Sequence, residues 1–234
     1  MKWLTWGGAT AAVAVGAAVM AGLGWRGVTL LLAFFVSGSL LTRWSGGAGG
    51  QRSARQVVAN GGVAAAAALA GWWAVAAGAL AAAAADTWAT EIGAFSKRPP
   101  RLVTTGASVA PGTSGGITLL GTLGGATGAV MMGVLAGVLE PVNGAARSAL
   151  TGPALALGVA FAGVVGMLAD SLLGATAQGH FECASCGRRY ERATVVCHEP
   201  VRRIGGLAWL DNDGVNLVTT LVGALAALAW GSWA

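Results

Sequence analysis

Two acidic residues follow an apolar run in the stretch ADTWATEIGAFSKRPPR, residues 85–101. Asp86 and Glu91 offer hard oxygen ligands, which suit Mg²⁺ if the helix ends between them. Three cations come next: Lys97, Arg98 and Arg101. A basic loop stiffened by two prolines and placed beside carboxylates indicates bound phosphate. The alternative is an interfacial acid pair followed by a loop that only orients the chain.

A glycine-rich loop, PGTSGG at residues 111–116, stands directly before another apolar run. The amide groups of such a loop bind anions at a helix N-terminus. The loop lacks the Gly-Lys-Ser/Thr ending of a P-loop, and in the alternative interpretation a hydroxyl side chain only caps the helix. The candidate phosphate-binding residues are Gly112, Thr113, Ser114, Gly115 and Gly116.

A third polar group opens the last apolar run, in WLDNDGVN. Asp211, Asn212, Asp213 and Asn216 place two carboxylates and two amides within six residues. A helix cap needs only one of them. The group therefore predicts a divalent ion or a metal-bound nucleotide.

Arg55 and Asn60 lie in RSARQVVANG, where the third apolar run begins. A side-chain amide inside an apolar run must find a hydrogen-bond partner. Asn60 therefore either joins two helices or contacts a ligand, and Arg55 is a candidate for the same ligand site.

A weak internal repeat pairs Asp86-Thr87 with Asp170-Ser171, because each pair closes an apolar run. Downstream, residues 114–130 resemble residues 212–228. A duplication predicts parallel repeats whose Asp–hydroxyl corners face each other across one site, which makes Thr87 and Ser171 candidate ligand residues. The alternative is that Ala/Gly/Leu-rich helices resemble one another without common origin.

The spacing Cys183-x₂-Cys186, followed by Cys197 and His198, has the ligand types of a structural zinc site. His180 is an alternative fourth ligand, because two adjacent residues seldom both bind one ion. The competing interpretation is a set of reduced thiols.

The composition is that of a polytopic membrane protein. Of 234 residues, 55% are hydrophobic and 10% are charged, whereas soluble domains carry about 25% charged residues. The net charge of +5 is expected to report orientation in the membrane rather than nucleic-acid binding, and three cysteines do not indicate a disulfide scaffold. We expect one all-α integral-membrane domain over residues 1–234, with a cytoplasmic Cys-containing loop at 179–212.

The apolar segments set the number of membrane crossings. They are 4–24, 27–42, 57–85, 115–139, 153–177 and 214–233. Most approach the ~20 residues that span a bilayer, and the first is expected to be a retained helix rather than a cleaved signal peptide. The long segment 57–85 is either one tilted helix or a pair of short helices that turn near Gly71, which gives six or seven crossings.

The positive-inside rule favours seven. With a pair of helices, twelve of the fourteen Lys and Arg residues fall on one side, and only Arg26 and Arg147 fall on the other. A single helix would divide them five to nine. We therefore expect a cell inner-membrane protein with a cytoplasmic N-terminus and every polar cluster on the cytoplasmic face. Trp72 and Trp73 would anchor the turn at the opposite interface.

Four motifs resemble a known family: RSARQVVANG, ADTWATEIGAFSKRPPRLVTTGASVAPGTSGGITLLGT, GMLADSLLGATAQ and GLAWLDNDGVNLVTTLVGA. It is a family of polytopic membrane proteins that includes plant and cyanobacterial phytyl-phosphate kinase and animal transmembrane protein 19. The similarity spans roughly residues 43–230. The Cys-containing loop also looks like one that many bacterial and archaeal members carry.

The resemblance implies a kinase that transfers the γ-phosphoryl group of CTP or another NTP to an isoprenyl monophosphate of phytyl, geranylgeranyl or farnesyl type. It implies Mg²⁺ held by carboxylates, for which the candidates are Asp86, Glu91, Asp170 and Asp213. Lys97, Arg98 and Arg101 would neutralise phosphate oxygens, and the glycine-rich loop would cradle the nucleotide. Phosphoryl transfer relies on positioning and charge neutralisation, so no strong general base is needed.

Three rival functions stay open at this point. A CDP-lipid-forming cytidylyltransferase would use the same residues and release pyrophosphate. A small-solute transporter would place its carboxylates near the midplane rather than at one surface, and a non-catalytic scaffold would not need so many convergent polar residues. The expected partners are a nucleotide, a lipid substrate and membrane lipid, with no nucleic acid; the isoprenoid length and the oligomeric state stay open.

Overall fold

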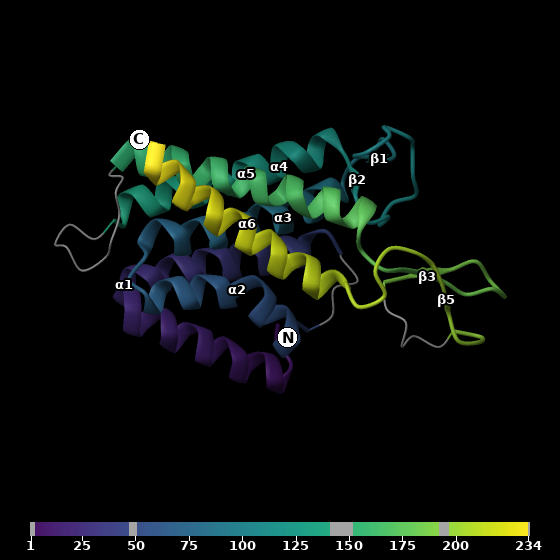
Figure 1. Cartoon of the computed structure of the whole chain (residues 1–234), viewed down its shortest axis with the longest axis horizontal. Coiled ribbons are helices and arrows are strands. Elements are labelled where there is room, and N and C mark those ends of the chain that lie inside the picture. The colour runs from purple at the N-terminus through teal and green to yellow at the C-terminus, as the bar shows by residue number, and fades with distance from the viewer. Residues whose placement is uncertain (1–2, 47–50, 141–151, 192–196, 234) are drawn as a thin grey trace.

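A computed structural model describes residues 3–46, 51–140, 152–191 and 197–233 of the chain. The helices are α1 (Trp6–Trp44), α2 (Ala54–Leu69), α3 (Trp73–Gly93), α4 (Leu119–Val138), α5 (Gly152–Thr176) and α6 (Asn212–Trp233). The strands are β1 (Arg101–Leu102), β2 (Gly116–Ile117), β3 (His180–Glu182), β4 (Arg189–Tyr190) and β5 (Arg202–Gly205). The predicted all-α helix bundle is confirmed, and the short strands decorate it (Figure 1).

Helix α1 is a hairpin rather than one continuous rod. Gly24 has φ 63° and ψ −161°, which interrupts the helix. A Cβ added to Gly27 would lie 2.9 Å from Cγ1 of Val19, eight residues earlier, a separation of roughly 12 Å along a straight helix. The Trp3 and Phe35 rings also meet, with centroids 5.7 Å apart. Residues 6–23 and 25–44 therefore run back to back, as the two separate apolar segments predict.

The long apolar segment 57–85 is also divided, between α2 and α3. Gly71 makes the turn with φ +72°. Helix α3 then runs on to Gly93, so the expectation that Asp86 closes a helix is wrong: Asp86 lies inside α3, and its helical turns continue past Glu91. Asp170 likewise lies inside α5. The interfacial role expected for Trp73 is wrong too, because its ring is fully buried and its Nε1–H donates to the Ala136 carbonyl at 3.1 Å.

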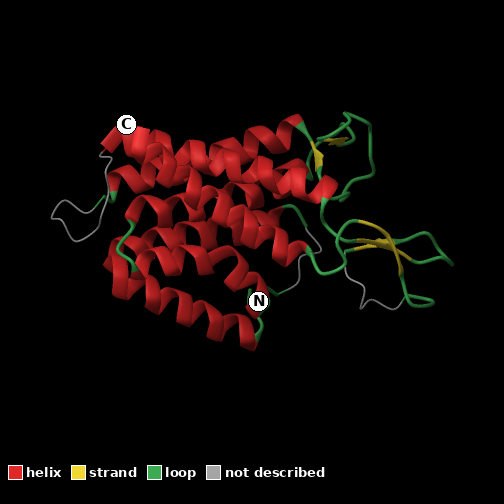
Figure 2. Ribbon diagram, viewed as in Figure 1, coloured by secondary structure: helices red, strands yellow, loops and turns green. Residues whose placement is uncertain are grey.

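The chain turns gather at two opposite ends of the bundle. At one end Arg52 pairs with the N-terminal segment, where its amide donates to the Trp3 carbonyl at 3.0 Å. Both small sheets extend from this same end in Figure 2, whereas the C-terminus lies at the other. Of the described Lys and Arg residues, only Arg26 lies at the C-terminal end. Lys2, Arg147 and Arg192 lie outside the described residues.

Helix α3 is the centre of the bundle, and its residues 76–85 are almost entirely buried. Glycines let the neighbouring helices approach it closely. On α4, a Cβ at Gly121 would lie 2.6 Å from the Ala89 carbonyl oxygen. On α6, a Cβ at Gly223 would lie 2.6 Å from the Gly78 oxygen. This close packing fixes the polar end of α3 against its neighbours.

Four of the described helices are long and apolar enough to cross a membrane: α1, α4, α5 and α6. Helix α2 has only 16 residues, fewer than the ~20 of a full crossing. The count of seven crossings, and which end of the bundle faces the cytoplasm, stay predictions.

Two small antiparallel sheets complete the fold. Strand β1 pairs with β2, with Arg101 opposite Ile117, and this hairpin carries the glycine-rich loop. The other sheet has the order β4-β3-β5, with Phe181 opposite Tyr190 on one side and Arg203 on the other.

Candidate functional site

The two aspartates of the proposed repeat meet at the polar end of the bundle. Asp86 on α3 and Asp170 on α5 line the same cavity, and their carboxyl groups are close enough to interact electrostatically. One oxygen of Asp170 accepts a hydrogen bond from the Thr219 hydroxyl of α6 at 2.9 Å, and Thr219 itself is buried. Two carboxylates this close repel one another unless a cation or a proton lies between them. They therefore form a candidate metal site.

The carboxylate pair lines a cavity of about 420 Å³ between α3, α5 and the loop that precedes α4. All five predicted residues of the glycine-rich loop line it: Gly112, Thr113, Ser114, Gly115 and Gly116. Within the described residues, the amides of Thr113 and Gly116 donate to backbone carbonyls, whereas those of Gly112 and Ser114 have no backbone acceptor. Free amides beside carboxylates suit a phosphate that shares a metal ion.

Close contact with α5 fixes the position of the loop. Gly115 has φ +77°, and a Cβ there would lie 2.5 Å from the Ala175 Cβ. A Cβ at Gly174 would in turn lie 2.9 Å from the Gly115 nitrogen. Only glycine fits this backbone conformation and this spacing, so the loop rests directly on the end of α5.

The three predicted phosphate-binding cations separate in the structure. Arg98 lines the cavity. Arg101 instead donates to the Gly106 carbonyl at 2.8 Å and thereby braces the β1–β2 hairpin. Lys97 is exposed and does not line the cavity. The geometry thus favours Arg98 as the cation of the site.

Six polar residues of the cavity were not predicted from the sequence: Thr90, Ser96, Thr118, Thr122, Gln178 and Glu191. Gln178 is 2% exposed, and its Nε2 has no hydrogen-bond partner among the described residues. Glu191, at the end of β4, accepts a hydrogen bond from the Ser114 hydroxyl at 2.8 Å. Thr90 lies one helical turn after Asp86 on α3. The four-residue spacing could have revealed Thr90, whereas Gln178 and Glu191 reach the site only through tertiary folding.

Glu91 does not join the carboxylate pair. It accepts hydrogen bonds from the hydroxyls of Thr42 at 2.6 Å and of Ser45, both at the end of α1. Because α3 continues through residues 86–91, the two acids point to different faces of the helix. The structure therefore gives Glu91 contacts that tie α1 to α3.

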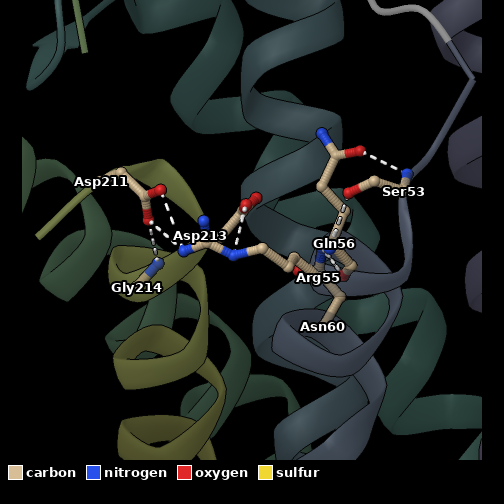
Figure 3. Close-up of polar contacts among 7 residues, drawn as sticks. All are labelled: Ser53, Arg55, Gln56, Asn60, Asp211, Asp213 and Gly214. Carbon is tan, nitrogen blue, oxygen red and sulfur yellow. Dashed lines mark hydrogen bonds and ion pairs between the residues drawn. The ribbon is translucent and has the colours of Figure 1, made fainter. Parts of the chain in front are cut away.

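The acidic group at the start of α6 pairs with a cation. Arg55 on α2 forms ion pairs with Asp211 at 3.0 Å and with Asp213 at 3.6 Å. Asp211 also accepts a hydrogen bond from the Gly214 amide at 3.1 Å, as a helix cap does. Figure 3 shows Arg55 between the two carboxylates. Neither carboxylate lines the cavity, so the four predicted magnesium ligands divide among three places.

The remaining candidates lie around these groups. Asn212 and Ser171 line the cavity. The Asn60 amide donates to the Gln56 carbonyl at 3.1 Å, within its own helix. Thr87 faces Gly38 of α1: a Cβ added to Gly38 would lie 3.1 Å from the methyl carbon of Thr87. Asn216 is buried in α6 and does not line the cavity.

The predicted zinc ligands also come together. The ligand atoms of Cys183, Cys186, Cys197 and His198 all lie within 4.8 Å of one another. Backbone hydrogen bonds, chiefly from His198, lower the pKa of Cys183 to about 6, so a thiolate is available near neutral pH. The alternative ligand His180 instead lies against the Gly174 carbonyl, with Nε2 at 3.1 Å from the oxygen.

The fold and the site define a helical membrane protein with a polar, carboxylate-bearing cavity at one end of its bundle. The chain belongs to the integral membrane protein family DUF92, whose family model matches residues 1–224. This membership confirms the resemblance carried by the four sequence motifs.

Relatives of the chain include one protein from Arabidopsis thaliana and one from Methanocaldococcus jannaschii. The chain is 35% identical over 150 residues to Protein PGR of Arabidopsis thaliana, which is 58% of this chain and 47% of the relative. It is 33% identical over 141 residues to Uncharacterized membrane protein MJ0933 of Methanocaldococcus jannaschii, 60% of this chain and 44% of the relative. The aligned part thus spans less than half the length of each relative. No solved structure matches the chain.

Proposed function

We propose that the chain is a Mg²⁺-dependent membrane phosphotransferase that moves the γ-phosphoryl group of CTP or another NTP to an isoprenyl monophosphate. The observation that carries the proposal is the Asp86–Asp170 pair in a cavity shared with the glycine-rich loop. The substrate class follows from the family resemblance of the motifs.

The carboxylate pair fits a magnesium site. Mg²⁺ in phosphoryl-transfer sites is commonly bound by one or two carboxylates together with substrate phosphates and water. Asp86 and Asp170 supply two carboxylates from neighbouring helices, and Thr219 fixes the orientation of the second. When bound, Mg²⁺ supplies charge neutralisation for the transferring phosphoryl group.

The other cavity residues act on the phosphates. Arg98 pairs with phosphate oxygens, the amides of Gly112 and Ser114 donate hydrogen bonds to further phosphate oxygens, and the buried Gln178 amide donates to a bound oxygen. A lipid monophosphate is ionised at neutral pH, so the residues need only hold it in line with the γ-phosphorus. The cavity volume of about 420 Å³ falls in the usual range of small-molecule sites, about 300–1,000 Å³.

One wall of the cavity borders an exposed apolar part of the bundle surface. Leu168 lines the cavity and is 40% exposed, and Leu172 one turn later is 47% exposed. A prenyl chain could therefore stay in the bilayer along α5 while its phosphate enters the cavity. The cavity lies at the polar end of the bundle, where a soluble nucleotide can reach it. A transporter would instead place its binding site near the midplane of the membrane.

The test is a lipid-phosphate kinase assay on the purified chain in detergent, with Mg²⁺, γ-labelled CTP, ATP or GTP, and geranylgeranyl or phytyl monophosphate. The proposal expects label in a lipid diphosphate. Label in pyrophosphate, with an unlabelled CDP-lipid, would overturn it in favour of a cytidylyltransferase. No turnover by folded protein with any nucleotide or chain length would contradict both.

A further inference from the structure

The sheet β4-β3-β5 has almost no hydrophobic core of its own. In the described part of residues 180–205, only Phe181 and Cys183 are buried. Units this small usually need a disulfide or a metal ion in addition to apolar burial. The three cysteines of the chain are free, so a metal ion is the remaining stabiliser.

Two pairs of side chains in this sheet region have nearly the spacing of tetrahedral zinc ligands. The Cys186 and Cys197 sulfurs are 3.6 Å apart, and the Cys197 sulfur is 3.3 Å from Nδ1 of His198. Zn–S bonds of about 2.3 Å and Zn–N bonds of about 2.0 Å place such pairs roughly 3.8 and 3.5 Å apart. The side chain of the fourth ligand, Cys183, is fully buried.

Cys183 and Cys186 lie in one tight turn that ends at Gly187. The Gly187 amide donates to the Cys183 carbonyl at 2.8 Å, and Gly187 takes φ +67°. This turn joins Cys183 and Cys186 in the C-x₂-C spacing of zinc sites, and their sulfurs belong to the group of four ligand atoms that lie within 4.8 Å of one another.

We propose that Cys183, Cys186, Cys197 and His198 bind one structural Zn²⁺ that holds the β4-β3-β5 sheet together and keeps Glu191 against the glycine-rich loop. Three thiolates and an imidazole select zinc over hard cations. The link to the cavity is direct: Glu191 follows Tyr190 of β4 and accepts the Ser114 hydroxyl at 2.8 Å. The metal site does not depend on the phosphotransferase proposal.

The first measurement is the metal content of the full chain, purified in detergent with a tag that contains no histidine. About one zinc per chain is expected, and Cys186→Ser should lose most of it. His198→Cys keeps a zinc ligand and should retain the metal, which separates ligand loss from misfolding. Ser185→Ala in the same turn is the matched control and should also retain zinc.

Three outcomes would overturn the metal site. They are zinc-free wild-type protein after growth in zinc-supplemented medium, iron with acid-labile sulfide in place of zinc, and a Cys186–Cys197 disulfide found by mass spectrometry. Each is read without any enzyme assay, so failure of the kinase proposal would leave the result intact.

Hydrogen exchange tests the link to the cavity. Removal of zinc with a chelator should speed amide exchange in residues 180–191 and in the glycine-rich loop, while α3 and α5 stay protected. Faster exchange in the sheet alone, with an unchanged loop, would overturn the role assigned to Glu191.

Discussion

Two pairs of aspartates lie at the polar end of the same bundle and differ in what neutralises them. Asp211 and Asp213 share the guanidinium of Arg55. Asp86 and Asp170 line one cavity, and within the described residues neither forms an ion pair. The first pair joins α2 to the start of α6, and Arg55 supplies its counter-charge within the folded chain. The second requires a cation or a proton, so it is the pair we assign to chemistry.

The largest effect should come from removing one carboxylate of the second pair. Asp86→Asn keeps the side-chain shape but removes the charge that Mg²⁺ needs, and kcat/KM should fall about 10²- to 10³-fold. Glu91→Gln is the control in the same helix, since Gln still accepts from Thr42, and it should keep most activity. Equal losses in both variants would contradict the division between the two acids.

Arg98 and Lys97 are adjacent cations of which only the first lines the cavity. Hydrogen bonds to charged groups contribute about 1.5–3 kcal/mol, so Arg98→Ala should raise the nucleotide or lipid-phosphate KM roughly tenfold to a hundredfold. Lys97→Ala should change it little. Steady-state kinetics on the two purified variants checks this. A larger rise in KM for Lys97→Ala than for Arg98→Ala would show that the phosphate binds outside the cavity.

Gly115 and Gly106 both have positive φ, but only Gly115 is crowded, by Ala175 at 2.5 Å. Alanine at either position costs about 1–2 kcal/mol of backbone strain. Gly115→Ala should in addition push the glycine-rich loop off α5 and lower kcat/KM about tenfold, because a displacement of about 1 Å can cost more than that. Full activity of Gly115→Ala, measured beside Gly106→Ala, would show that the loop does not position the substrate.

The Arg55 pairs should matter for stability rather than for catalysis. The Arg55 side chain is 66% exposed, so solvent screens the interaction, and Arg55→Ala should cost only about 1 kcal/mol. A drop of about 2–4 °C in the thermal transition is expected, with kcat nearly unchanged, and Arg43→Ala is the exposed control. A folded Arg55→Ala variant without activity would place this pair in the active site.

The helices and their breaks could be predicted because apolar length is a local property and charged residues can be counted along the whole chain. Gly24 and Gly71 mark both hairpin turns. The predicted end of α3 at Asp86 was wrong. Hydropathy falls at Asp86, but the backbone hydrogen bonds of the helix continue to Gly93. The polar face of such a helix is decided by its neighbours, here α5 and α1.

The site was predictable only in part for the same reason. The possible repeat led us to expect Asp86 and Asp170 at one site, and both residues line the same cavity; the duplication itself stays a prediction. The sequence did not reveal, however, that Arg55 on α2 pairs with Asp213, and this ion pair separates Asp213 from the cavity. Gln178 and Glu191 enter the cavity through loops whose paths no periodicity specifies.

The most direct test of the carboxylate pair is Mn²⁺ binding, followed by electron paramagnetic resonance in the presence of a non-hydrolysable CTP analogue. Mn²⁺ replaces Mg²⁺ at oxygen ligands. The account predicts about one bound Mn²⁺ in the wild type, loss of binding in the Asp86→Asn/Asp170→Asn double variant, and retention in Asp211→Asn/Asp213→Asn. Binding that survives the first double variant and disappears in the second would contradict it.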